Sequence, residues 1–479
     1  MKFKMTAPER KWVWYDVGNS AFTLLVSTLL PIFFNTVASS NGISEASYLS
    51  YWAYATSIST AVVAVLGPTL GTLSDLRGMR KKIFSAAILV GALGCAVLGF
   101  VQHWLWFLVL FVLAKSAYQL SLVVYDSMLC DVTQPERMDE VSSRGYAWGY
   151  IGSCIPFLLT IGVYVLYEMF SLIPLMAAMV LVFLIVAVWW VACAFPLWKS
   201  YEQRRFVEPG GHPVKTGLKN LGGVFREIWH KKQILFFLLA FFFFIDGVYT
   251  IIDMATAYGT SLGLDTVSLV LALLVTQVVA FPAAILLGML SRRVKPEYLI
   301  IVCIAAYFFI TVYAVFLDKT YEFWILAVCV GLFQGTIQAM SRSYYAKIIP
   351  QEKAGEYFGV YDIFGKGASF MGTFLVALVA DLTGRENLGV GALAVMFVIG
   401  LAFFIFAVRA KRNAVPEGEA PSGAPEAASA EAMTAEAMTA EETVEVTAEV
   451  TAEETAEETE NAAGGGDGAG SGNGKSDET

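Results

Sequence analysis

Long apolar runs dominate this 479-residue chain and limit what it can fold into. A run of about 20 apolar residues is long enough to cross the hydrocarbon core of a bilayer as a helix. Only 15% of the residues are charged, whereas a soluble chain carries about 25%. The sequence therefore predicts an all-α polytopic membrane protein with twelve transmembrane helices. The predicted spans cover roughly 13–38, 49–73, 82–101, 104–129, 144–167, 171–196, 233–257, 266–290, 297–317, 322–346, 356–380 and 389–410.

One long polar connection divides the spans into two groups of six. Sequence similarity between the approaches to the fifth and eleventh spans, at 135–145 and 350–359, supports two related halves. Such halves pack around a central solute pathway in many transporters. We expect an N-terminal half (1–198), a central loop (199–232), a C-terminal half (233–410) and a tail (411–479).

The basic residues distinguish the two sides of the membrane. With the N-terminus inside, most bases fall on the inner side, and the outer loops carry only Lys319 and Arg385. Positive charge favours the cytoplasmic side. The sequence therefore predicts an integral plasma (inner) membrane protein with both termini in the cytoplasm, and we expect it to be a monomer among membrane lipids.

The formal net charge of −9 combines two different segments. From Glu417 onward there are 17 acidic residues and one base, Lys475, which gives −16. The rest has 31 bases and 24 acids, which gives +7. The acidic tail is rich in Ala, Glu, Thr and Gly, and this composition predicts disorder. We expect no transport role for it.

Motifs for other kinds of chemistry are missing from the sequence. The six cysteines are scattered singly, so neither a disulfide framework nor a metal site is predicted. The chain has no HExxH or GxxxxGK[ST] motif, so it resembles neither a zinc-dependent hydrolytic enzyme nor a nucleotide-driven pump. We expect no cofactor and no nucleic-acid partner.

A short charged turn lies between the second and third spans. It contains Gly71, Asp75, Arg77, Gly78 and Arg80. The glycines allow close helix approach and a tight turn. The simplest interpretation is a positive-inside loop with a turn glycine. The pattern also resembles the loop between helices 2 and 3 of major facilitator superfamily transporters, which favours a role in gating.

The second half lacks part of this pattern, because 288–293 keeps the glycine and the bases but has no acid. A gate built on this turn should therefore be one-sided. We expect Asp75, Arg77 and Arg80 to hold the cytoplasmic ends of the halves together, with Asp75 near the N-terminus of span 11. This contact would favour the outward-facing state.

Polar side chains recur at helical spacing in spans 1, 4, 7 and 10. Such groups are costly inside a membrane and indicate function. Asp362 and Lys366 in span 11 are spaced to pair on one helix face. Burial favours the protonated form of a carboxylate, so Asp246, Asp362 and Lys366 are candidates for ion coupling. The candidates for solute binding are Asn19, Lys115, Gln119, Asp246, Thr250, Gln334 and Gln338.

Each polar group also has a structural interpretation. Lys115 and Asp246 could form an ion pair inside the bundle. The glutamines could join neighbouring helices by hydrogen bonds. Asp16 could interact favourably with the dipole at the N-terminus of its helix. Asp126 and Arg342 could face lipid headgroups.

Five segments resemble one transporter family across almost the whole membrane part. They are Tyr15–Phe22, Val141–Gly152, Asp246–Ile251, Gly335–Tyr344 and Glu356–Lys366. These segments are similar to the bacterial and fungal family related to the autophagy-linked vacuolar amino-acid effluxers. The sequence departs at Val17-Gly18, where the family often has Trp-Ala. The resemblance implies a major facilitator fold whose spans 1, 4, 7 and 10 line a central cavity, and it implies amino-acid efflux.

The leading hypothesis is a secondary active transporter that works by alternating access. Its solute would be a small polar molecule of the amino-acid class, coupled to H+. Lys115 and Asp246 would face the charged groups of the solute, and Asn19, Gln119, Gln334 and Gln338 would orient it. The alternative is a transporter-like scaffold or receptor without flux.

Overall fold

The computed structural model describes residues 3–208, 223–261, 266–317, 319–367 and 369–413. Compactness divides the chain into residues 1–414 and residues 415–479. The described residues all lie in the first unit, so both predicted halves belong to one compact body. The tail that composition predicts to be disordered lies outside the described residues, except that α15 continues to Asn413.

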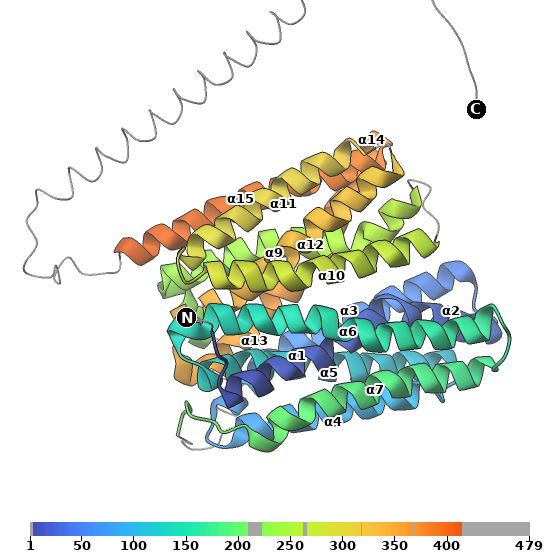
Figure 1. The fold of residues 1–479 in the computed structure, drawn as a ribbon, viewed down its shortest axis with the longest axis horizontal. Helices are drawn as coiled ribbons and strands as arrows, with labels where there is room; N and C mark the ends of the chain where they lie inside the picture. The colour runs from blue at the N-terminus through green and yellow to red at the C-terminus, as the bar shows by residue number, and fades with distance from the viewer. Residues whose placement is uncertain (1–2, 209–222, 262–265, 318, 368, 414–479) are drawn as a thin grey trace, which may run out of the picture. The chain divides into compact units, whose positions relative to one another are not determined.

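The described residues form a bundle of long helices (Figure 1). A further helix covers residues 223–230 of the central loop. The elements are α1 (Ala7–Ser27), α2 (Leu29–Ser40), α3 (Glu45–Asp75), α4 (Met79–Leu98), α5 (Trp104–Val132), η1 (Pro135–Arg137), α6 (Met138–Glu168), α7 (Leu175–Ser200), α9 (Lys232–Ser261), α10 (Thr266–Leu290), α11 (Pro296–Val315), α12 (Thr320–Ile348), η2 (Gln351–Lys353), α13 (Ala354–Gly367), α14 (Ser369–Thr383) and α15 (Glu386–Asn413).

The helices account for the predicted spans. Within the described part of the chain, 10 helices are long and apolar enough to cross a membrane, and the bent pair α1–α2 raises the number to 11. The predicted span 356–380 corresponds to α13 and α14, which are described on the two sides of residue 368. In Figure 1, α1–α7 form one group of helices, and α9, α10, α11, α12, α14 and α15 form the other. The helix α13 lies against α3 and α5 of the first group. The hydropathy pattern therefore located the long apolar helices, but it gave no sign of the bend between α1 and α2.

The bend between α1 and α2 has a local cause. The two helices meet at Thr28 with an angle of 41°. Pro31 has no N–H to donate to the carbonyl of Ser27, and the hydroxyl of Thr28 donates instead to the carbonyl of Leu24 at 2.5 Å. A proline and a back-bonding hydroxyl together are a known source of helix bending.

Aromatic packing holds α1 against α5. The rings of Trp12 and Tyr125 stack at 4.5 Å, and each side chain donates to the other residue's carbonyl, at 3.0 and 3.1 Å. One turn along, the hydroxyls of Tyr15 and Ser121 lie 2.7 Å apart. These contacts fix the rotation of both helices, so the acids next to them, Asp16 and Asp126, are held in place.

Candidate functional site

The two halves are tied together toward one end of the bundle. This end contains the turn 76–78, η1, residues 201–208, the turn 291–295 and η2, and we call it the basic face. It lies at the left of Figure 1, where the N-terminus is drawn. The contacts described below join the halves at or near this face.

Asp75 is the last residue of α3, and its side chain contacts the first turn of α13. Its carboxylate accepts hydrogen bonds from the backbone N–H groups of Gly355 at 2.7 Å and Glu356 at 2.8 Å. A helix N-terminus carries unpaired N–H groups and partial positive charge, so it binds a carboxylate well. The predicted proximity of Asp75 to the start of span 11 is therefore present in the structure.

Arg80 supports Asp75 from inside the first half. Its fully buried guanidinium donates to Asp75 and, at 2.6 Å, to Asp131 at the end of α5. Asp131 also accepts from the hydroxyl of Tyr201 and from the N–H of Arg205 at 2.9 Å. One buried ion-pair network thus connects the start of the central loop to Asp75, which contacts α13.

Glycines make the contact between α3 and α13 possible. A Cβ at Gly71 would overlap the carbonyl of Gly355, and a Cβ at Gly355 would overlap the hydroxyl of Ser74. Gly78 has a φ of 73°, in the left-handed region that glycine adopts without strain. The close helix approach and the tight turn expected from the sequence are both present.

Arg77 does not take part in the contact between the halves that the sequence analysis expected. Its side chain is 66% exposed and pairs with Glu208 of the central loop at 3.4 Å. The guanidinium also lies over the ring of Phe206, 5.1 Å from the centroid. Of the two predicted arginines, only Arg80 supports Asp75, because the left-handed turn at Gly78 directs the two side chains differently.

Arg342 of α12 forms a second connection between the halves. It is 2% exposed and donates to Asp126 of α5 at 3.0 Å and to Asp16 of α1 at 3.4 Å. Its Nε donates to the hydroxyl of Ser142 on α6 at 2.9 Å. The guanidinium also lies 4.4 Å from the ring centroid of Tyr146. A single side chain of the C-terminal half, Arg342, therefore contacts three helices of the N-terminal half.

The first turn of α6 supplies two more acids to this interface. Asp139 accepts from the hydroxyl of Ser343 at 2.6 Å and pairs with Lys347 at 2.5 Å. Glu140 pairs with Arg292, which follows α10, at 2.5 Å. The partial positive charge at the N-terminus of α6 stabilises both carboxylates. The same carboxylates also pair with bases of the other half.

The pKa of one acid at the basic face is strongly lowered. Glu227, in the helix 223–230, pairs with Lys231 at 2.8 Å and with Lys353 of η2 at 3.2 Å. The hydrogen bond from Lys231 is the main cause that lowers the pKa of Glu227 from 4.5 to about 2. A lowered pKa stabilises the fold above pH 4.5, and this stabilisation is lost only as the pH falls toward 2. Glu227 therefore adds no pH dependence between pH 5 and 8.

Three predicted solute-binding residues are buried on the helices that face the other half. Asn19 donates to Asp16 at 3.1 Å, which ties it to the Arg342 cluster. Gln338 lies one turn before Arg342 on α12 and is 9% exposed. Gln119 is 7% exposed, and its Oε1 has no hydrogen-bond partner among the described residues. An unpaired buried acceptor is costly unless a ligand or water pairs with it.

Lys115 and Asp246 make different contacts in the structure. Asp246 is fully buried and accepts from the hydroxyl of Thr250 at 3.3 Å. A Cβ at Gly372 would lie 2.9 Å from its carboxylate, so Asp246 packs against α14 within its own half. Lys115 lies over the ring of Phe111 at 5.6 Å and interacts electrostatically with Asp253 of α9.

Asp362 faces the interior of the bundle. This half-buried residue interacts electrostatically with Tyr118 of α5 and Tyr249 of α9. The side chain of Lys366 lies outside the described part, so its predicted pairing with Asp362 stays a prediction.

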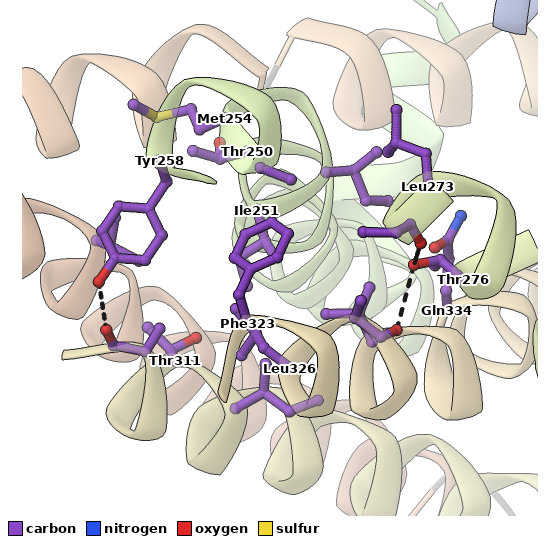
Figure 2. A pocket seen from close by; sticks show the side chains of 18 of the residues that line it. Thr250, Ile251, Met254, Tyr258, Leu273, Thr276, Thr311, Phe323, Leu326 and Gln334 are labelled. Atoms are coloured by element: carbon purple, nitrogen blue, oxygen red, sulfur yellow. Dashed lines mark hydrogen bonds between the residues drawn. The ribbon is translucent and has the colours of Figure 1, made fainter. Parts of the chain in front are cut away.

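Thr250 and Gln334 line a pocket inside the C-terminal half (Figure 2). Its wall is mostly apolar and includes Met254, Phe323 and Leu326. The hydroxyl of Tyr258 donates to the carbonyl of Ala314 at 2.5 Å, and that of Thr276 donates to Ala327 at 3.2 Å. Their hydroxyls are thus satisfied within the protein, and the pocket suits an apolar group.

Sequence reasoning missed the residues that connect the halves most directly. The sequence alone also fits Asp126 and Arg342 facing lipid headgroups and Asp16 as an acid at a helix start. Their pairing is a signal that exists only in three dimensions, since Asp16 and Arg342 are 326 positions apart. The one signal in the sequence was the occurrence of three ionisable residues inside apolar runs.

Comparison with known proteins agrees with this architecture. The family model described as "Vacuole effluxer Atg22 like" matches residues 8–137 and 130–416. The uncharacterized MFS-type transporter YxiO of Bacillus subtilis is 42% identical over 410 residues, which are 85% of this chain and 96% of that protein. Autophagy-related protein 22-1 of Aspergillus clavatus is 24% identical over 59% of this chain, and the match spans 51% of the fungal protein.

Solved transporter structures share the fold. The major facilitator superfamily transporter FucP, in an outward conformation, matches with a TM-score of 0.63 and 13% identity over 84% of this chain and 98% of that one. The human organic anion transporter MFSD10 matches with a TM-score of 0.61 and 15% identity over 83% of this chain and 99% of that one. Together with the family match and the helix arrangement, these comparisons show that the chain is an MFS-type transporter that belongs to the family of Atg22-like vacuole effluxers.

Proposed function

We propose that this transporter is secondary active and moves a small polar solute of the amino-acid class by alternating access, outward from the cytoplasm. The observation that carries the proposal is the arrangement of contacts between the halves. Asp75, Asp126, Asp139 and Glu140 of the first half each hold a group of the second half near the basic face. Contacts that close one side and can be broken without unfolding either half are what alternating access requires.

The basic face is then the cytoplasmic side of the inner membrane, and the described state is closed on that side. The high density of bases in its turns supports this orientation. Gly71, Asp75, Gly78 and Arg80 form the proposed gate. The direction of transport rests on the family description as effluxers.

The proposed solute site lies between the halves, farther from the basic face than the Arg342 cluster. Lys115 is 11 residues before Asp126 on α5, about 16 Å along the helix. Lys115 would meet a carboxylate of the solute, while Asn19, Gln119 and Gln338 orient its polar groups. Thr250 and Gln334 would receive the apolar part of the solute, since both line the pocket of Figure 2.

Ion coupling is proposed to be to H+, with Asp246, Asp362 and Lys366 as contributing residues. Support comes from Asp246, which is fully buried and whose Oδ2 has no hydrogen-bond partner among the described residues. A buried carboxylate with one unpaired oxygen favours its protonated form.

Purified protein in proteoliposomes would test the proposal. We expect an imposed pH gradient to drive uptake or release of a labelled amino acid, and the substitution Asp246→Asn to remove the dependence on the gradient. Asp381→Asn, at an exposed position of α14, is the matched control and should transport normally. If no solute moved under any gradient, the alternative of a scaffold or receptor would be favoured.

A further inference from the structure

The Arg342 cluster is not balanced in charge. One guanidinium pairs with two carboxylates, Asp16 and Asp126, through separate nitrogen atoms. Arg342 is 2% exposed and Asp16 is 6% exposed. A buried group of two acids and one base carries one excess negative charge when both acids are ionised, and like charges in one site favour binding of a proton.

The described neighbours do not restore the balance. Asp362 of α13 also interacts electrostatically with Asp126, but as an acid it supplies no positive charge. Asn19 donates to Asp16 but carries no charge. The remaining titratable groups that interact with the pair are tyrosines, which stay protonated between pH 5 and 8. They are Tyr15, Tyr118, Tyr125, Tyr146, Tyr150, Tyr249 and Tyr361.

The position of the cluster connects its charge to the gate. Arg342 belongs to the C-terminal half, and both acids belong to the N-terminal half. Separation of the halves at the basic face would remove the base from Asp16 and Asp126 and leave two like charges on neighbouring helices of one half. Their repulsion, no longer offset by Arg342, favours the state in which one of them carries a proton.

We propose that Asp16 and Asp126 form a proton-binding site that controls opening of the basic face. A proton from water adds to one carboxylate, weakens its attraction to Arg342 and neutralises the excess charge. The proton reaches Asp126 first, because the side chain of Asp126 is 20% exposed while that of Asp16 is 9% exposed. The inference deepens the proposed function and rests on its alternating-access mechanism.

A native cysteine lies where opening can be measured. Cys130 is one turn beyond Asp126 on α5, and its Sγ lies 3.9 Å from the carbonyl of Ala346, one turn beyond Arg342 on α12. Cys130 is 1% exposed. It should react with a soluble thiol reagent only when the halves separate at this end.

The experiment uses the full-length protein with Cys130 as its single cysteine. The rate of maleimide labelling is measured between pH 5 and 8 and divided by the rate of the same protein with Asp126→Asn. Because both proteins are labelled at the same pH, the pH dependence of the labelling reaction itself cancels in the ratio. We expect a ratio of about 0.2 or less at pH 8 that rises toward 1 at pH 5. A ratio that stays constant would overturn the proposal.

Three further variants separate this site from its neighbours. Asp126→Glu keeps a carboxylate and should keep the pH response. Asp139→Asn removes a different contact between the halves, with Lys347, and should raise labelling at every pH while the response remains. Asp362→Asn should also keep the response, and its loss there would place the proton at Asp362 instead. If Asp126→Asn cannot be purified, Asp16→Asn serves as the reference.

The outcome is independent of the transport assay. A protein with Cys303 as its single cysteine, 1% exposed within α11 of the second half, should label slowly throughout and reports unfolding. No solute is needed for labelling. A pH response without flux would contradict the proposed function alone, and flux with a pH-independent ratio would contradict the proton site alone.

Discussion

At the scale of single residues, Asp75 shows how one carboxylate can join two distant parts of a chain. Its partners Gly355 and Glu356 are 280 and 281 positions away. The sequence already pointed to this residue, because the turn around it resembles the loop between helices 2 and 3 of major facilitator superfamily transporters. The roles of Asp16, Asp126 and Arg342 could not be found in the same way, since each of them has a reasonable local explanation.

Replacement of Asp75 by Asn should open the basic face more often. The amide keeps the size of the side chain. It loses the negative charge that interacts with the N-terminus of α13 and with the guanidinium of Arg80. An interaction of this kind contributes about 1 kcal/mol, so labelling of Cys130 at pH 8 should rise about fivefold. Arg77→Ala is the matched control, because Arg77 is 66% exposed. Equal labelling in the Asp75 variant and the parent protein would exclude the gate.

At the scale of elements, the fit between α3 and α13 depends on glycine. Gly71 packs on the carbonyl of Gly355, and a Cβ at Gly359 would lie 2.5 Å from Pro68. Two helices from different halves can therefore approach closely over about two turns. Such a contact is sensitive to a single methyl group, because packed interiors have little free space.

The substitution Gly71→Ala should destabilise the protein and loosen this end. Overpacking by one methyl group costs about 1–3 kcal/mol, and the obstacle here is backbone that cannot move aside easily. Thermal unfolding of the purified protein should show a lower Tm. Gly162→Ala on α6 is the control, because a Cβ there would meet no atom within 4 Å. That variant should keep or slightly raise the Tm, since Ala favours a helix by up to about 1 kcal/mol. Equal Tm changes in the two variants would contradict the close contact.

At the scale of the whole molecule, the residues of the proposed sites lie within the helical body. The residues proposed for solute binding, coupling and gating all precede α15 (Glu386–Asn413), the last described helix. The acidic residues from Glu417 onward belong to the second unit of the chain. Transport and any role of the tail should therefore be separable.

Deletion of residues 413–479 should leave flux within about twofold of the full chain in proteoliposomes, because the deletion removes no residue of the proposed site. A longer deletion from residue 387 is the control. It removes α15, which packs against α9 and α11, and should abolish transport. Loss of flux in the shorter deletion would instead support a function that depends on the tail.

The sequence by itself determined the class of protein, the positions of the long apolar helices and the position of the charged turn at Asp75. These features follow from local properties, since the hydropathy of about 20 consecutive residues decides whether a helix can cross a membrane. Only the tertiary structure decided that Asp246 packs inside its own half, that Arg77 lies outside the contact, and that Arg342 joins Asp16 and Asp126. Helical spacing places a side chain on a face of its own helix, but the partner of that face depends on the packing of the whole bundle.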